Sequence, residues 1–158
     1  MSKKKKKIVA VSGGFDPIHI GHVRMIQDAR KLGNVIIFLN TDEWLKRKKG
    51  YIFMPWQERA EVLLSIKGVK EVYSAMDDDN TVCKALEFYK PDIFANGGDR
   101  KPGLVPEYQV CEKLGIEMAF SVGGDDKPQS SSWLVDKARF ARYKYTERPT
   151  WFKEVHYG

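Results

Sequence analysis

The sequence lacks several features that define common protein classes. It has no apolar run close to the 18 or so residues that a membrane-spanning helix needs, and its charged N-terminus is not followed by the apolar segment of a secretory signal. Its only cysteines, Cys83 and Cys111, have no spacing typical of a metal site, so we expect two reduced thiols rather than a disulfide framework. Together these absences predict a cytoplasmic protein with no membrane partner.

Positive charge is scarce outside one segment. The net charge is +6, but the five lysines of residues 3–7 leave only 22 of the 27 basic residues, against 21 acidic ones, in the rest of the chain. Such a run could bind nucleic acid or an anionic lipid surface. A solvated terminus explains it without any partner. We therefore expect residues 1–6 to form a disordered tail, and we do not expect nucleic acid as a partner.

The 158 residues suffice for one hydrophobic core and are few for two domains. Short apolar runs alternate with segments of helical periodicity. The expected strands are residues 7–12, 35–39, 69–74, 93–96 and 116–122, and the expected helices are 20–32, 56–65, 81–89, 106–114 and 130–143. This alternation predicts an α/β fold, namely a Rossmann-like, doubly wound, parallel five-stranded sheet with helices on both faces. We assign residues 7–143 to this domain and 144–158 to a C-terminal extension.

Ligands bind to such sheets beyond the carboxyl ends of the strands, which directs attention to the loops at residues 13–22, 40–54, 96–103 and 122–132. In the first loop, His19 and His22 lie three residues apart where a helix begins, so both rings share one side of its first turn. A helix N-terminus favours anions, and two imidazoles add donors at phosphate-contact distance. Two merely capping histidines would explain less, because the chain has only three histidines in total.

The string GGFDPIHIGH at residues 13–22 resembles the GxFDxxHxGH signature of the cytidylyltransferase-like nucleotidyltransferase superfamily. Four later segments resemble other parts of that superfamily in the same order. They are the lysine-rich stretch 40–50, the arginine of Gln57-Glu58-Arg59, the GGDRKP string at 97–102 and the serines at 130–132. The lysine-rich stretch and GGDRKP are most similar to the adenylyltransferase domain of ADP-heptose synthesis, and glycerol-3-phosphate cytidylyltransferase is also similar.

The resemblance implies transfer of CMP or AMP from CTP or ATP, with Mg²⁺ on the triphosphate, to a phosphorylated small molecule such as a sugar or polyol phosphate. Pyrophosphate is released. The implied catalytic residues are His19, His22, Lys46 and Arg59: the imidazoles donate to the α and β phosphates, Lys46 bridges donor and acceptor phosphates with Lys49 as a second candidate, and Arg59 contacts the acceptor phosphate or pyrophosphate. The implied nucleotide-binding residues are Gly13, Gly14, Phe15, Asp16, Gly21, Gly97, Gly98, Asp99, Ser130, Ser131 and Ser132.

Two departures leave the choice between CTP and ATP open. Gly14 stands where the family often has a threonine hydroxyl, and only Lys127 lies near the position of an arginine that often precedes the serine run. No metal-binding residue is assigned, because the carboxylates of residues 77–79 precede a helix and are expected to cap it. Three tryptophans are expected to be core or interface aromatics, namely Trp56, Trp133 and Trp151.

Simpler explanations exist for the other residues. The lysines of residues 46–49 could form a solvated patch, Arg59 could pair with Glu58 or Glu61 on a helix surface, and the serines could be an N-cap. Two rival functions also stay open. One is a nucleotide-sensing or RNA-binding module without turnover, and the other is an adenylyltransferase of coenzyme synthesis of the FAD or dephospho-coenzyme A type. A homodimer is an open alternative to a monomer.

Overall fold

The computed structural model describes residues 4–97, 106–124 and 127–144. At its centre is a five-stranded parallel sheet in the order β3-β2-β1-β4-β5. The strands are β1 (Ile8–Gly13), β2 (Asn34–Leu39), β3 (Val69–Ser74), β4 (Ile93–Ala95) and β5 (Glu117–Ala119). The chain adds β2 and β3 on one side of β1 and then crosses over to add β4 and β5 on the other. This confirms the predicted Rossmann-like sheet, with its switch point between β1 and β4.

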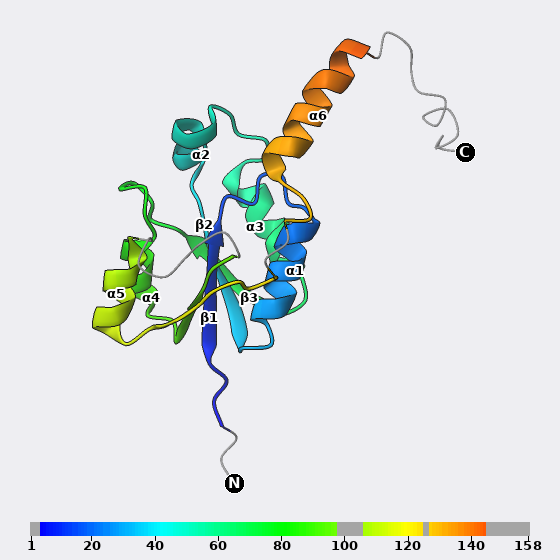
Figure 1. Ribbon diagram of the computed structural model, residues 1–158. Helices are drawn as coiled ribbons and strands as arrows, with labels where there is room; N and C mark the ends of the chain where they lie inside the picture. Colours follow the sequence, from blue (N-terminus) through cyan, green and yellow to red (C-terminus); the bar gives the residue numbers. More distant parts are fainter. Residues whose placement is uncertain (1–3, 98–105, 125–126, 145–158) are drawn as a thin grey trace.

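Helices cover both faces of the sheet (Figure 1). They are α1 (Ile20–Ala29), α2 (Asp42–Lys49), α3 (Trp56–Leu64), α4 (Cys83–Tyr89), α5 (Glu107–Leu114) and α6 (Ser131–Lys144). In Figure 1, α1 and α3 lie on one side of the sheet and α4 and α5 on the other, while α2 lies above the carboxyl ends of the strands and α6 projects away from the body.

Each face of the sheet has its own core because successive strand residues point to opposite faces. On β1, Val9 and Val11 pack with Ile26 of α1 and Leu63 of α3. Ala10, between them, joins the other cluster, which includes residues of α4 and α5. The middle of β1 is therefore buried from both sides, as the short apolar run of a central parallel strand predicts.

The stretch 40–54 is predicted from the sequence to be a loop, and this prediction is wrong because the stretch contains α2. Thr41 is the N-cap, and its side chain accepts a hydrogen bond from the amide of Trp44 at 3.2 Å. Gly50 ends the helix in the left-handed conformation, with φ of 79°. The first turn carries two acidic residues and the last turn four basic ones, which suits the helix dipole. Apolar periodicity is absent, since only Trp44 and Leu45 are apolar.

The last strand is shorter than expected. The sequence predicts a strand over residues 116–122, but β5 ends at Ala119, since β4, its neighbour among the described residues, provides just three paired residues. The chain then turns at Ser121, whose φ is 57°, and enters the segment that leads to α6. This early end releases Val122 and Gly123 from the sheet so that they line a pocket.

The described residues include no helix with both the length and the apolar character needed to cross a bilayer. Cys83 and Cys111 are both free thiols. Burial raises the pKa of Cys111 to about 11, so this thiol stays protonated and packs as a small apolar group.

Candidate active site

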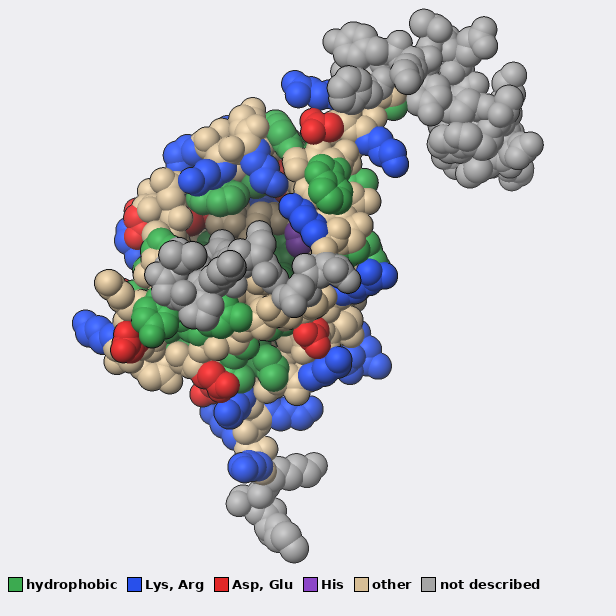
Figure 2. Space-filling view, in the orientation of Figure 1, with side chains coloured by type: hydrophobic (Ala, Val, Ile, Leu, Met, Phe, Trp, Pro, Cys, Tyr) green, Lys and Arg blue, Asp and Glu red, His purple; other side chains and the backbone are tan. Residues whose placement is uncertain are grey.

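A pocket of about 310 Å³ opens at the carboxyl edge of the sheet. Four chain segments meet there: the first turn of α1, the end of α2, the residues after β4 and the segment between β5 and α6. The charged or hydrogen-bonding side chains that line it include His19, His22, Lys49, Lys127 and Ser131. Figure 2 shows a histidine, in purple, at the bottom of a hollow bordered by basic side chains, in blue. The pocket lies at the switch point, where ligand binding was expected.

His19 and His22 are fixed by the backbone at the start of α1. His19 is the N-cap, and its Nδ1 accepts a hydrogen bond from the amide of Gly21 at 3.0 Å. The amide of His19 donates in turn to Nδ1 of His22 at 3.2 Å, so the two residues form a reciprocal capping box in which both acceptors are imidazoles. Because Nδ1 accepts in each ring, the neutral tautomer of each carries its proton on Nε2. The first turn therefore presents two Nε2–H donors.

The same packing keeps both rings neutral. The two imidazoles are stacked with centroids 3.8 Å apart, and the ring of Phe15 lies 4.7 Å from the His22 ring. Burial, with smaller effects of His19 and the Lys49 charge, lowers the pKa of His22 to about 3. The pKa of His19 is lowered by burial and by the nearby charges of Lys127 and Lys49. Each neutral imidazole keeps one N–H, so each ring can donate one hydrogen bond to a phosphate.

The glycines of residues 13–22 serve the packing of the loop, and one of them also lines the pocket. A Cβ atom on Gly21 would lie 2.9 Å from Cε1 of His19, so any side chain there would displace the capping ring. Gly21 lines the pocket. A Cβ on Gly14 would lie 3.1 Å from the side chain of Leu45, because α2 packs closely against this turn. Gly13 ends β1, where its carbonyl accepts from the amide of Asn40 at 2.9 Å.

Two members of the string, Phe15 and Asp16, do not reach the pocket surface. Phe15 is buried in the core beside His22. Asp16 is fully buried, and its carboxylate accepts hydrogen bonds from the amides of Phe53 and Met54 at 2.7 and 2.6 Å. The expectation that these two side chains contact nucleotide does not agree with this geometry. Asp16 instead holds the histidine loop against the segment before α3, and Phe15 packs beneath His22.

Arg59 requires the same correction. Its side chain is 0% exposed, and its guanidinium donates to the Met54, Gly14 and Asn40 carbonyls at 2.8 to 2.9 Å and to the Asp42 carboxylate at 2.6 Å. The predicted direct contact with a phosphate is therefore not available to it. Arg59 joins three segments that surround the pocket. No local pattern in the sequence indicates this role, because the partners are mainly backbone carbonyls.

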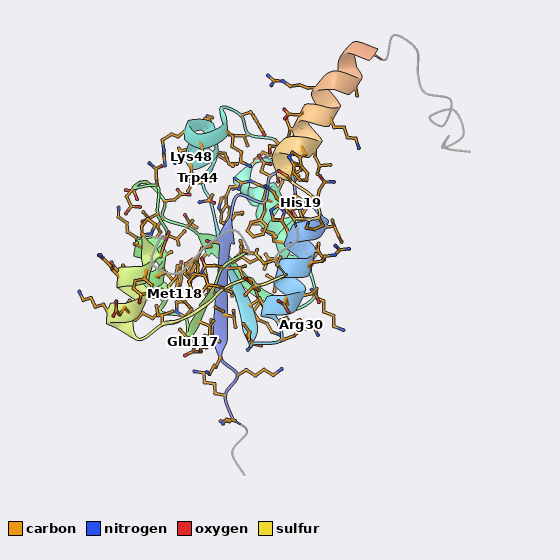
Figure 3. All side chains as sticks on the ribbon, viewed as in Figure 1. His19, Arg30, Trp44, Lys48, Glu117 and Met118 are labelled. Carbon is orange, nitrogen blue, oxygen red and sulfur yellow. The ribbon has the colours of Figure 1, made fainter. Side chains whose placement is uncertain are left out.

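On α2, it is Lys49 rather than Lys46 that lines the pocket. Lys46 lies one turn earlier and is exposed. Figure 3 places Lys48 and Trp44 on α2, across the carboxyl ends of the central strands from His19. The structure therefore brings the last residue of α2 to the histidines, and Lys46, the residue expected to bridge the phosphates, is not among the residues that line the pocket.

The later segments contribute as expected in part. Gly97, Ser130 and Ser131 line the pocket, whereas Gly98 and Asp99 lie outside the described residues. The hydroxyl of Ser131 donates to the Pro17 carbonyl at 2.8 Å, which ties the start of α6 to the histidine loop. The hydroxyl of Ser132, which is exposed, lies 2.9 Å from that of Ser130.

The segment between β5 and α6 is among the ligand loops expected from the sequence, but the sequence assigns only its serines to the site, and the structure adds Gly123 and Lys127 to the pocket lining. Gly123 has φ of 89°, and a Cβ there would lie 3.0 Å from Cα of Met25, so only glycine lets this backbone approach α1 so closely. Its amide donates to the Asp28 carboxylate at 2.8 Å. Lys127 also lines the pocket. The sequence indicates Lys127 only through its place near the arginine position of the family, and the path of the chain brings it to the pocket beside His19.

The acidic stretch does not cap α4 through Asp77. Asp77 is buried and accepts from the side chains of Asn40 and Thr41 at 2.8 and 2.7 Å, so it holds the start of α2. Asp79 accepts from the amide of Thr81 at 2.9 Å, just before α4. Among the described residues, no three His, Cys, Asp or Glu side chains lie together as a metal site would require.

The tryptophans differ from one another. Trp56 packs against the core, and its indole donates to the Leu39 carbonyl at 3.1 Å, as a core aromatic should. Trp133 is 53% exposed, so it is not a core aromatic of this chain, and the ammonium of Lys127 lies 5.3 Å from its ring centroid. Trp151 lies outside the described residues.

Comparison with known proteins identifies the class to which this fold and pocket belong. Residues 10–121 match the family described as cytidylyltransferase-like. The match spans most of the chain and includes the histidine string, so the chain belongs to the cytidylyltransferase-like family of nucleotidyltransferases.

Individual curated proteins are also similar to this chain. The chain is 33% identical over 140 residues to the bifunctional protein HldE of Syntrophotalea carbinolica, covering 85% of this chain and 28% of that protein. It is 38% identical over 144 residues to HldE of a Nitratiruptor species, covering 88% of this chain and 29% of that protein. The chain thus spans little more than a quarter of the length of these relatives.

Two solved structures are also similar. A lipopolysaccharide core biosynthesis protein from Thermoplasma volcanium superposes with a TM-score of 0.60 at 26% identity, covering 73% of this chain and 93% of that one. Pantothenate synthetase from Thermus thermophilus superposes with a TM-score of 0.52 at 14% identity, covering 74% of this chain and 55% of that one. The second likeness shows a shared fold alone.

Proposed function

We propose that this chain transfers AMP or CMP from ATP or CTP to a phosphorylated small molecule of the sugar or polyol phosphate type, releasing pyrophosphate. The observation that carries the proposal is the pair of neutral imidazoles at the start of α1, each with Nδ1 bonded to a backbone amide and Nε2–H left as a donor. They share one pocket with Lys49 and Lys127. Neutral donors and two cations around one cavity suit a polyphosphate substrate.

In the proposed reaction, an oxygen of the acceptor phosphate attacks the α-phosphorus of the nucleotide. A new bond forms between that oxygen and the α-phosphorus, and the bond to the oxygen that bridges the α and β phosphates breaks. Pyrophosphate leaves with the electron pair of the broken bond. A phosphate nucleophile is already anionic near neutral pH, so the protein need not supply a general base. Its task is to align two anions and stabilise charge as it moves.

The histidines suit the donor nucleotide. Their Nε2–H groups would donate to oxygens of the α and β phosphates, and their fixed orientation removes any reorganisation during the reaction. Arg59 and Asp16 would act indirectly, because each is buried and holds the segments that carry the histidines and α2.

Lys49 and Lys127 suit the stabilisation of negative charge that moves from the attacking phosphate to the leaving pyrophosphate. Lys49 and Lys127 lie in different segments of the pocket and both charges act on His19. We assign to Lys49 the bridging of donor and acceptor phosphates that the family resemblance implied for Lys46. Gly97 and the backbone of 122–124 would contact the nucleoside.

We propose that Mg²⁺ enters with the triphosphate and supplies charge neutralisation there. The described residues contain no preformed cluster of metal ligands, and Mg²⁺ is commonly bound through substrate phosphates together with water. No protein residue is assigned to hold it. We also propose that residues 7–143 form the catalytic domain, with 1–6 as a tail and 144–158 as an extension.

The nucleotide and acceptor can be identified together. Purified protein is incubated with Mg²⁺, each of the four NTPs and a panel of sugar, polyol and vitamin phosphates while pyrophosphate release is followed, and the products are identified by mass spectrometry. We expect release that needs a phosphorylated acceptor and favours ATP or CTP. The similarity of the lysine-rich stretch and GGDRKP string to ADP-heptose synthesis makes ATP with sugar phosphates the first combination to try.

Other outcomes would contradict the proposal. Turnover only with FMN or phosphopantetheine would indicate a coenzyme-synthesis adenylyltransferase. Nucleotide or RNA binding that is lost at high salt, with no pyrophosphate from any combination, would indicate a binding module.

A further inference from the structure

Lys127 occupies a distinctive place in the pocket. It lies in the segment between β5 and α6, lines the cavity beside the histidine pair, and its charge is close enough to act on His19. A lysine on a surface segment has a long, freely rotating side chain, and holding its ammonium in one place costs conformational entropy. Some contact is therefore needed to keep the charge at the pocket.

Trp133 provides such a contact. It lies in the first turn of α6, and the ammonium of Lys127 sits over its ring at 5.3 Å from the centroid, within the range of a cation–π interaction. The indole is 53% exposed, so core packing does not account for a tryptophan here.

The turn that carries Trp133 is itself anchored. The hydroxyl of Ser131 donates to the carbonyl of Pro17, two residues before His19, and Ser130 and Ser132 are joined through their hydroxyls. Figure 1 shows α6 projecting away from the body beyond this first turn. The indole therefore stands on a support that is tied to the histidine loop, and it can fix Lys127 relative to the histidines.

We propose that Trp133 is a positioning residue, which holds the ammonium of Lys127 at the pocket so that Lys127 binds a phosphate group of a substrate. The inference rests on the proposed function, since it deepens the description of that same pocket. The ligand chemistry is a phosphate oxygen, and it could belong to the nucleotide triphosphate or to the acceptor. Binding of that phosphate changes the position of the charge over the indole, and the tryptophan emission should change with it.

A double-mutant cycle tests the coupling. Trp133→Leu should raise KM about two- to fivefold for one substrate, the range that a cation–π contact at an exposed site is worth, and should change kcat less than KM. Trp133→Phe, which keeps a weaker ring, should show a smaller rise. In a Lys127→Met background, Trp133→Leu should have no further effect, because there is no ammonium left to position.

Two matched controls separate this role from general effects of surface change. Phe88→Leu removes an aromatic side chain that is 70% exposed on α4, and Lys137→Met removes an exposed lysine on α6. Both should leave KM and kcat unchanged. Unchanged KM values for both substrates in Trp133→Leu would overturn the proposal. Effects of Trp133→Leu and Lys127→Met that simply add would overturn it as well.

The source of the phosphate is found by comparing the two KM values. A rise confined to the nucleotide assigns Lys127 to the triphosphate, and a rise confined to the acceptor assigns it to the acceptor phosphate. Titration of tryptophan emission with ATP, with glycerol 3-phosphate and with inorganic tripolyphosphate provides an assay without turnover. At least one of these should change the emission of the unsubstituted protein. The part of the change that comes from Trp133, taken as the difference from Trp133→Phe, should be lost in Lys127→Met.

That titration distinguishes failure of the inference from failure of the proposed function. If no combination of substrates releases pyrophosphate, the proposed function fails, but an emission change that depends on both residues would still support the subsite. If pyrophosphate is released and the emission change is as large in Trp133→Phe as in the unsubstituted protein, the function stands and the inference is overturned.

Discussion

The two sides of the pocket are built in different ways. At the start of α1, the histidines are stacked, neutral and hydrogen-bonded to backbone amides, and buried Arg59 and Asp16 support the same loop. At the end of α2, the side chains of residues 46–49 are exposed and charged. The histidine side is fixed before any ligand arrives, whereas the lysine side is solvated and can adjust. Substitutions should therefore have large effects on the first side and smaller ones on the second.

The largest expected effect is on stability, through Arg59. Arg59→Met should lower the free energy of unfolding by about 3–5 kcal/mol, because it leaves the Asp42 carboxylate and three backbone carbonyls without their buried partner. Urea denaturation measures this. Arg47→Met, on exposed α2, removes two bonds near the surface, to the Asp77 carbonyl at 2.9 Å and to the Asn80 side chain at 3.3 Å, and should cost no more than about 1 kcal/mol. Similar costs for both variants would contradict the buried role of Arg59.

The next largest effect is on turnover, through the histidines. His22→Ala and His19→Ala should each lower kcat about 10²- to 10³-fold, comparable to loss of one preorganised donor in an oxyanion site. Steady-state pyrophosphate release measures this.

His19→Asn provides the control, because asparagine is also a good N-cap and should preserve the stability of α1 while losing the Nε2–H donor. Near-normal turnover in both alanine variants would remove the histidines from the catalytic role.

A smaller effect should appear in the pH dependence of stability. The pKa of His22 is about 3 in the folded protein and about 6.5 in an unfolded chain, so between these values the unfolded chain binds the extra proton. The contribution of His22 is thus complete above pH 6.5 and is lost as the pH falls. The free energy of unfolding should decrease by roughly 1–2 kcal/mol from pH 7 to pH 5. In His22→Asn the decrease should be clearly smaller; an unchanged decrease would mean that other groups cause it.

The lysine side should respond more weakly still. Lys49→Met should lower kcat/KM roughly tenfold, equivalent to about 1.4 kcal/mol, because its charge faces the same cavity as the histidines. Lys46→Met and Lys48→Met, on the same helix but outside the pocket lining, should each change kcat/KM by less than about threefold. A larger loss in Lys46→Met than in Lys49→Met would support the original family-based expectation instead.

The same contrast explains what the sequence could predict. Alternating strands and helices are visible because buried strands and amphipathic helices carry their own periodicity. The histidine pair is visible because the hydrogen bonds that fix its rings join residues at most three apart. Sequence reasoning misses α2 because its exposed, basic sequence has no apolar period. The role of Arg59 and the place of Lys127 beside the histidines depend on contacts between segments far apart in the sequence, which no local pattern records.

The smallest effect should come from the other group of lysines. Deleting residues 2–6 removes most of the excess positive charge of the chain, and if charge alone attracted the substrate, kcat/KM would fall at low salt. However, β1 begins at Ile8 at the amino edge of the sheet (Figure 1), and residues 4–6 precede it there. Six strand residues span about 20 Å, and the pocket opens at the opposite edge. That distance is about twice the Debye length at 0.1 M salt. Pyrophosphate release by the truncated protein should therefore equal that of the full chain at 0.1 M salt, whereas Lys49→Met, a single charge placed at the pocket, should still show its loss. A truncated protein that loses kcat at this salt concentration would show that the tail belongs to the site. It would then be wrong that a lysine acts on turnover only when its side chain lies at the pocket.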